Sequence, residues 1–81
     1  MRVRVKYFAL HRDLVGKADE ELRLDEGATV EDLLSRLVSL YPSLVDARAY
    51  MLISLNGESV DKGARLKDGD VVALFPPVGG G

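Results

Sequence analysis

The chain has few of the residue types from which enzymes commonly build active sites. Its 81 residues include no cysteine and a single histidine, His11. Without cysteine, the chain cannot form disulfides, thiolate metal sites, cysteine nucleophiles or iron–sulfur clusters. One histidine is too few for a histidine-rich metal site or for a histidine-based catalytic triad. We therefore expect little catalytic equipment in this chain, with no metal and no bound cofactor.

Long hydrophobic runs and a strong net charge are also lacking. No apolar run approaches the ~20 residues that span a membrane. Residues 1–6 alternate charged and apolar types, unlike the uninterrupted apolar core of a signal peptide. A net charge of −2 gives no general attraction to nucleic acid. The sequence therefore predicts a soluble, cytoplasmic protein that binds neither nucleic acid nor a membrane.

The overall composition is that of a single folded domain. Hydrophobic residues make up 47% of the chain and charged residues 30%, which is typical of globular proteins rather than of disordered ones. A domain of this size buries only about 60–65% of the surface of its unfolded chain. Its stability margin is therefore expected to be thin in the absence of partners.

The first third of the chain predicts two strands. Residues 2–9 and 20–24 alternate apolar and polar side chains with a period of two. Residues 11–17 read as a loop with at most one helical turn, and His11 is expected to be solvated there. This connection is too short for a parallel crossover, so the two strands are predicted to form an antiparallel hairpin.

One long amphipathic helix is predicted next. Thr29 is a good N-cap residue, and Asp32 stands where its capping-box partner would be. Pro42 is expected to end the helix. Apolar residues between these limits recur at helical spacing and predict a core stripe, namely Val30, Leu33, Leu34, Leu37, Leu40 and Tyr41.

The last third predicts a mixed sheet. Residues 51–55 and 71–75 read as strands, 58–60 as a short return strand after the Asn56-Gly57 turn, and 43–50 are ambiguous. Placing the last strand parallel to the first, in the middle of the sheet, would put Phe8 and Phe75 on one outward face. A single helix covers one face of a sheet, so an exposed apolar patch is expected on the other.

The final stretch, Phe75 to Gly81, suggests a specialised arm. Pro76 and Pro77 cannot donate to a sheet and hold the chain extended. Residues 76–81, if extended, reach roughly 20 Å at ~3.3 Å each. Gly79, Gly80 and Gly81 lack a Cβ, so they could thread a narrow channel and present an unhindered terminal carboxyl group. We divide the chain into a domain at residues 1–76 and a flexible tail at 77–81.

Several segments resemble the small subunits of molybdopterin synthase, a family of sulfur carriers with the ubiquitin-like β-grasp fold. The similar segments are Phe8-Ala9, Arg12-Asp13-Leu14 with Gly16, Asn56-Gly57, Asp68-Gly69-Asp70, and Phe75-Pro76-Pro77-Val78 followed by Gly80-Gly81. The resemblance covers essentially the whole chain, and the closing run is its most specific part. It implies an α+β β-grasp fold with four to five strands in a mixed sheet and one main helix packed on one face.

The resemblance also implies a function. In that family an ATP-dependent adenylating enzyme of the ubiquitin-activating type converts the terminal glycine to a glycyl-adenylate, and sulfur then replaces AMP to give a thiocarboxylate. The large synthase subunit, expected in a heterotetramer, uses this sulfur to build the dithiolene of molybdopterin from cyclic pyranopterin monophosphate. The chain would then be a non-catalytic sulfur-donor subunit without activity alone.

Residue roles follow from the same resemblance. Gly81 would be the chemical site, while Gly79, Gly80 and Val78 would thread and Pro76 and Pro77 would aim the tail. Phe75, Phe8 and Arg12 would contact partners.

Three other functions remain open from the sequence. The chain could carry sulfur for another pathway, such as thiamine thiazole synthesis or tRNA thiolation. It could be a ubiquitin-like modifier that is joined to target lysines through Gly81. It could also be an interaction module with an idle tail.

Overall fold

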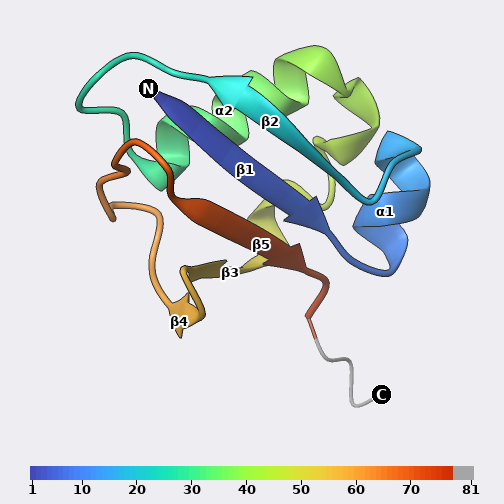
Figure 1. Ribbon diagram of the computed structural model, residues 1–81. Coiled ribbons are helices and arrows are strands. Elements are labelled where there is room, and N and C mark those ends of the chain that lie inside the picture. Colours follow the sequence, from blue (N-terminus) through green and yellow to red (C-terminus); the bar gives the residue numbers. More distant parts are fainter. Residues whose placement is uncertain (78–81) are drawn as a thin grey trace.

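The chain folds as two layers, a five-stranded mixed sheet and one main helix packed on one face of it. The computed structural model describes residues 1–77, and Figure 1 shows the sheet with α2 behind it. The elements in chain order are β1 (Arg2–Tyr7), α1 (Leu10–Val15), β2 (Asp19–Arg23), α2 (Val30–Leu40), the 3₁₀ turns η1 (Pro42–Leu44) and η2 (Arg48–Tyr50), β3 (Leu52–Leu55), β4 (Glu58–Ser59) and β5 (Val71–Phe75). The predicted α+β class and β-grasp order are confirmed.

The first and last strands lie side by side in the centre of the sheet. The strand order is β2-β1-β5-β3-β4, and β1 pairs in parallel with β5, with Val5 opposite Val72 and Tyr7 opposite Leu74. These four side chains are buried and face α2. The predicted central parallel pair is therefore confirmed, and the carboxyl ends of β1 and β5 meet at one end of the sheet (Figure 1).

The connection between β1 and β2 differs from the prediction. The two strands do form an antiparallel pair, but residues 10–15 form a helix, and His11 is only 1% exposed. The prediction of a solvated His11 is therefore wrong. His11, Leu14 and Val15 stand at i, i+3 and i+4, so they share the face of α1 that turns toward the core. The segment is too short for this periodicity to have been recognised.

Helix α2 begins at the predicted cap. The Asp32 amide donates to the Thr29 hydroxyl at 3.3 Å, and the Thr29 amide donates to the Asp32 carboxylate at 2.9 Å. Val30, Leu33, Leu34 and Leu37 are buried as predicted. Leu40, however, is 49% exposed, so its assignment to the core is wrong. The helix ends at Leu40, and η1 brings Leu44 into the core instead.

Two turns in the last third brace each other and fix where β5 begins. The Asn56 side chain donates to Asp70 at 2.9 Å and accepts from the Val71 amide at 2.9 Å. The second carboxylate oxygen of Asp70 accepts from the Lys67 amide at 2.7 Å. Asn56 and Gly57 both have positive φ, which explains the Asn-Gly pair in this turn. The segments Asn56-Gly57 and Asp68-Gly69-Asp70, which carry part of the family resemblance, therefore fix the start of β5 and do not form a reactive site.

In residues 1–77, no helix is long and apolar enough to cross a membrane.

Candidate functional site

The base of the tail lies where three strands end or begin. Phe75 is the last residue of β5, and it is followed by the half-buried Pro76 and the exposed Pro77. Because β1 is parallel to β5 and β3 is antiparallel to it, the end of β1 and the start of β3 lie at the same end of the sheet. Figure 1 shows β5 ending beside the end of β1.

Three exposed apolar side chains surround this point, Phe8, Leu52 and Phe75, which we call the exit patch. They are 40%, 49% and 36% exposed, respectively. Leu52 stands directly opposite Phe75 in the antiparallel pair of β3 and β5, so both side chains point to the face of the sheet that α2 leaves uncovered. The rings of Phe8 and Phe75 are stacked, with centroids 4.6 Å apart and planes 10° from parallel. The predicted common face of these two residues is confirmed.

The part of this open face that β1 and β2 form is polar. Along β1 the exposed residues Arg2, Arg4 and Lys6 alternate with buried ones, and they lead toward the patch. Arg4 forms ion pairs with Asp19 and Glu21 on β2. An apolar area within a charged surface is typical of a site that binds a protein partner. The exit patch thus has the composition expected of a contact surface, and its own side chains supply no acid, base or nucleophile; its role in partner contact stays a prediction.

Arg12 lies on α1, which directly follows the end of β1. It is exposed, and its backbone carbonyl accepts the amide of Gly16 at the end of the helix. Its helix is therefore at the same end of the molecule as the exit patch. A role in partner contact stays a prediction.

A polar cluster supports this end of the sheet from the core side. The Tyr7 and Tyr41 hydroxyls each donate to the same oxygen of Glu20 at 2.6 Å, and Lys17 lies 3.5 Å from the other oxygen. Partial burial alone would raise the pKa of Glu20, but the hydrogen bonds from Tyr41 and Tyr7 and the charge of Lys17 lower it overall. Burial and the bond to Glu20 raise the pKa of Tyr7. The cluster therefore joins β1, β2 and the end of α2 around one carboxylate.

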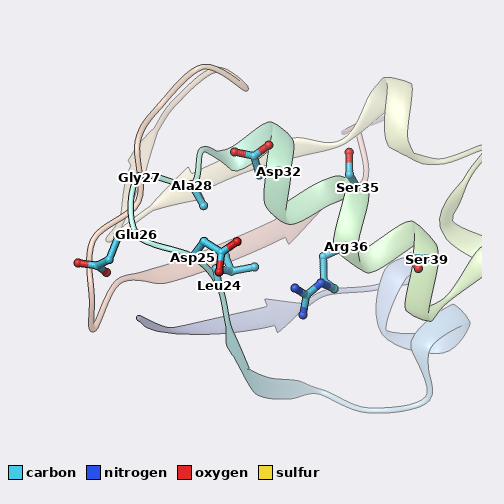
Figure 2. Close-up of a pocket in the computed structure, with 9 residues that line it drawn as sticks. All are labelled: Leu24, Asp25, Glu26, Gly27, Ala28, Asp32, Ser35, Arg36 and Ser39. Atoms are coloured by element: carbon cyan, nitrogen blue, oxygen red, sulfur yellow. The ribbon is translucent and has the colours of Figure 1, made fainter.

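A cavity of about 520 Å³ lies on the helix side of the molecule. Figure 2 shows its lining, which comes from residues 24–28 and from Asp32, Ser35, Arg36 and Ser39 on α2. Residues 24–28 follow the end of β2, which is antiparallel to β1, so the cavity lies at the opposite end of the sheet from the exit patch.

Within residues 1–77, no group of three or more histidine, cysteine, aspartate or glutamate side chains could hold a metal ion. The described part of the chain presents an exposed apolar patch at the point where the tail begins. The predicted roles of Val78, Gly79, Gly80 and Gly81 lie outside the described residues.

Comparison with known proteins identifies the family. The sequence model of the ThiS family matches residues 5–81. The chain belongs to the ThiS family. Among curated ThiS-like relatives, the molybdopterin synthase sulfur carrier subunit of Chlamydomonas reinhardtii is 40% identical, with both chains fully covered. The small archaeal modifier protein 3 of Haloferax volcanii is 33% identical, also over the full length of both chains.

Solved structures agree with this membership. The putative molybdopterin converting factor subunit 1 of Pyrococcus furiosus superposes with a TM-score of 0.86 at 40% identity, covering 95% of this chain and 98% of that one. Subunit 1 in a complex of subunits 1 and 2 of the molybdopterin-converting factor from Helicobacter pylori gives a TM-score of 0.71 at 27% identity, with full coverage of both chains. The resemblance to molybdopterin synthase small subunits and the β-grasp fold, both predicted from the sequence, are thereby confirmed.

Sequence reasoning found part of the site and missed part of it. Phe8, Phe75, Pro76 and Pro77 lie together at the base of the tail, whereas Leu52 was assigned only to a strand. The sequence could have identified Leu52, because alternate residues of a strand face opposite sides of the sheet and its neighbours Met51 and Ile53 are buried. The cavity lined by α2 left no signal in the sequence, since it depends on how the loop at residues 24–28 is placed.

Proposed function

We propose that this ThiS-family chain is the sulfur carrier subunit of a molybdopterin synthase. The observation that carries the proposal is the exit patch at the base of a Phe-Pro-Pro arm that leads to terminal glycines. The similarity to sulfur carrier subunits over the full chain supports it. In this proposal the partners bind the folded domain, and the arm carries the reactive group.

The chemistry of such a carrier takes place at the Gly81 carboxyl group. A carboxylate is a poor electrophile, so an ATP-dependent enzyme first joins it to AMP and releases pyrophosphate. A sulfide-level sulfur then attacks the acyl-adenylate carbonyl, the C–O bond to AMP breaks, and a thiocarboxylate forms. A dithiolene contains two sulfur atoms, so two loaded carriers are consumed for each molybdopterin. Water supplies the oxygen when the C–S bond of the carrier is hydrolysed, so each carrier returns as a carboxylate and can be loaded again.

Two partners follow from this chemistry. The large subunit of the synthase would bind the exit patch and receive the arm in its active site, in a heterotetramer. Support for such a partner comes from the complex formed by a structural relative. The second partner would be an adenylating enzyme of the ubiquitin-activating type, which must reach the same arm. Since both partners need the tail, they should bind one at a time, and loading and transfer would alternate in the cytoplasm.

A second candidate function is conjugation of Gly81 to lysines of other proteins. It is favoured by the 33% identity to a small archaeal modifier protein over the full length of both chains. The same activated glycine would serve both reactions, with an amine in place of sulfide as the nucleophile. A carrier for another sulfur pathway remains the closest alternative in chemistry.

The test is the accurate mass of the C-terminal tryptic peptide after incubation with ATP, the adenylating enzyme and a sulfur source. Cleavage after Lys67 releases residues 68–81, which contain no methionine, so methionine oxidation cannot imitate the exchange of oxygen for sulfur. We expect a sulfur-for-oxygen shift located at Gly81. The loaded protein, added to the large subunit and cyclic pyranopterin monophosphate, should then yield molybdopterin.

Each other function predicts a different result. A modifier would give higher-mass adducts on other proteins through an isopeptide bond to Gly81. A carrier for another pathway would be loaded normally but would give no molybdopterin with the large subunit. An unmodified peptide, with the adenylating enzyme shown to be active on another carrier, would contradict the proposal.

A further inference from the structure

Phe8 is held in place more firmly than an exposed residue at the end of a strand needs to be. Its amide donates to the Leu74 carbonyl at 3.2 Å, which extends the pairing of β1 with β5 by one bond. Its carbonyl accepts the His11 amide at 3.1 Å, which closes a turn into α1. Its ring is stacked on Phe75. The backbone and the side chain of Phe8 are therefore both fixed, although 40% of the side chain is exposed.

The turn that follows Phe8 contains backbone strain. Ala9 has φ 51° and ψ −125°, a region that residues other than glycine rarely adopt. Such a conformation persists only where the surrounding structure holds it. Here the bond from His11 to Phe8, the bond from the Asp13 amide to the Ala9 carbonyl at 3.2 Å, and the burial of His11 hold it. The strained turn at Ala9 thus keeps Phe8 beside the end of β5.

Phe75 is less firmly held than Phe8, because it is the last residue of its strand. Leu52 is its cross-strand partner on one side. Pro76 follows it and has no backbone N–H, so residue 76 cannot donate a sheet hydrogen bond that would hold the start of the arm. On the side of β1, the Phe8 ring covers Phe75 within the distance range of favourable aromatic pairs. The direction of the arm at Pro76 therefore depends on how Phe75 is held.

We infer that Phe8 is a positioning residue that acts through Phe75, fixing the direction in which the arm leaves the domain. The inference rests on the proposed function, because direction matters only if Gly81 must reach a reaction site. It differs from a role as a simple partner contact. A partner contact would set how tightly the large subunit binds, whereas a positioning residue sets how often the bound arm lies in the reactive geometry.

The first experiment separates affinity from rate in the assembled synthase. Phe8→Leu keeps an apolar side chain but removes the ring, while Phe8→Tyr keeps the ring. We expect Phe8→Leu to lower the single-turnover rate of sulfur transfer by about tenfold at saturating large subunit, and Phe8→Tyr to retain the rate. Phe75→Leu should lower the rate about as much as Phe8→Leu does. The double variant should lower the rate no further than either single variant, because the same ring stack is removed in all three.

Leu40→Ala is the matched control, since Leu40 is similarly exposed but lies at the end of α2, outside the exit patch. It should change neither the rate nor the affinity. If Phe8→Leu weakens binding of the large subunit but leaves the saturating rate unchanged, Phe8 is only a partner contact and the inference is wrong.

A second experiment needs no partner. In the free protein, Phe8→Leu should lower the NMR order parameter of the Phe75 amide and move the Phe75 ring resonances, while Phe8→Tyr should leave the order parameter unchanged. An unaltered order parameter in Phe8→Leu would overturn the inference. This readout also separates the two ideas, because failure of the wild-type protein to transfer sulfur would refute the proposed function while the NMR result would still decide whether Phe8 positions Phe75.

Discussion

Phe75 is 36% exposed although Leu74, its neighbour in the same strand, is fully buried. The difference arises because alternate residues of a strand face opposite sides of the sheet, and α2 covers only one side. An aromatic side chain in this position loses little conformational entropy on binding and offers a large contact area. The free protein therefore keeps a hydrophobic side chain in water at the point where the arm begins.

Replacing Phe75 with glutamate should weaken binding to the large subunit by about 2 kcal/mol or more, because a charge would be buried at the centre of the contact. Stability should change little, since the side chain is already partly exposed. Isothermal titration calorimetry of the complex measures the affinity, and thermal unfolding checks the fold. Leu40→Glu places the same charge on an exposed apolar position outside the exit patch and should bind normally. Equal affinity for both variants would show that the interface lies elsewhere.

At the scale of elements, both ends of α2 are held by hydrogen bonds of polar side chains. Glu20 joins β2 to Tyr7 of β1 and to Tyr41 at the end of α2. Its side chain is only 15% exposed, so its loss would leave two tyrosine hydroxyls without their acceptor. At the other end of α2, Thr29 and Asp32 satisfy amide groups that the helix itself cannot.

Replacing Glu20 with glutamine should destabilise the fold by about 1–2 kcal/mol, because charge-assisted hydrogen bonds become neutral ones. The pKa of Glu20 is lowered in the folded state from its ordinary value of 4.5. Its contribution is therefore fully present above about pH 4.5 and is lost as the pH falls through the lower folded pKa. Urea unfolding at neutral and acidic pH measures both effects. The difference between wild type and variant should shrink in acid, and a difference that stays constant would contradict this account.

Replacing Thr29 with alanine should cost about 1 kcal/mol, because the cap hydrogen bond to the Asp32 amide is lost. The matched control is Ser39→Ala, an exposed position in the same helix, which should be neutral or slightly stabilising because alanine favours helix. Urea unfolding at neutral pH compares the two. If both substitutions have the same effect, the cap contributes no stability.

The sequence predicted the elements whose patterns are long and regular. Two-residue alternation identified β1, and the apolar stripe with Thr29 identified α2. The short α1 was missed because six residues show too little periodicity to distinguish a helix from a loop. His11 was misplaced for the same reason. Leu40 matched the helical spacing, but spacing cannot tell that the chain leaves the helix there and fills the core with Leu44.

At the scale of the whole molecule, the fold separates stability from reactivity. Within the part of the chain that the structure describes, Leu74 is the last residue of the buried core. The proposed chemistry takes place at Gly81, seven residues further along the chain. A domain with a thin stability margin can in this way present a reactive end group without building a strained or polar active site into its small core.

This separation predicts the outcome of removing Gly81 alone. The melting temperature should stay unchanged, because the core cluster, which lies within residues 1–74, keeps all of its members. Thiocarboxylate formation and molybdopterin synthesis should both be abolished, because the chain would end one residue short of the reaction centre. Thermal unfolding and the mass of the C-terminal peptide measure the two effects. Adding one alanine after Gly81 tests the opposite displacement and should also abolish loading, since the end group would be longer and bear a Cβ. Full activity in either variant would show that the terminal glycine is not the site at which sulfur is carried.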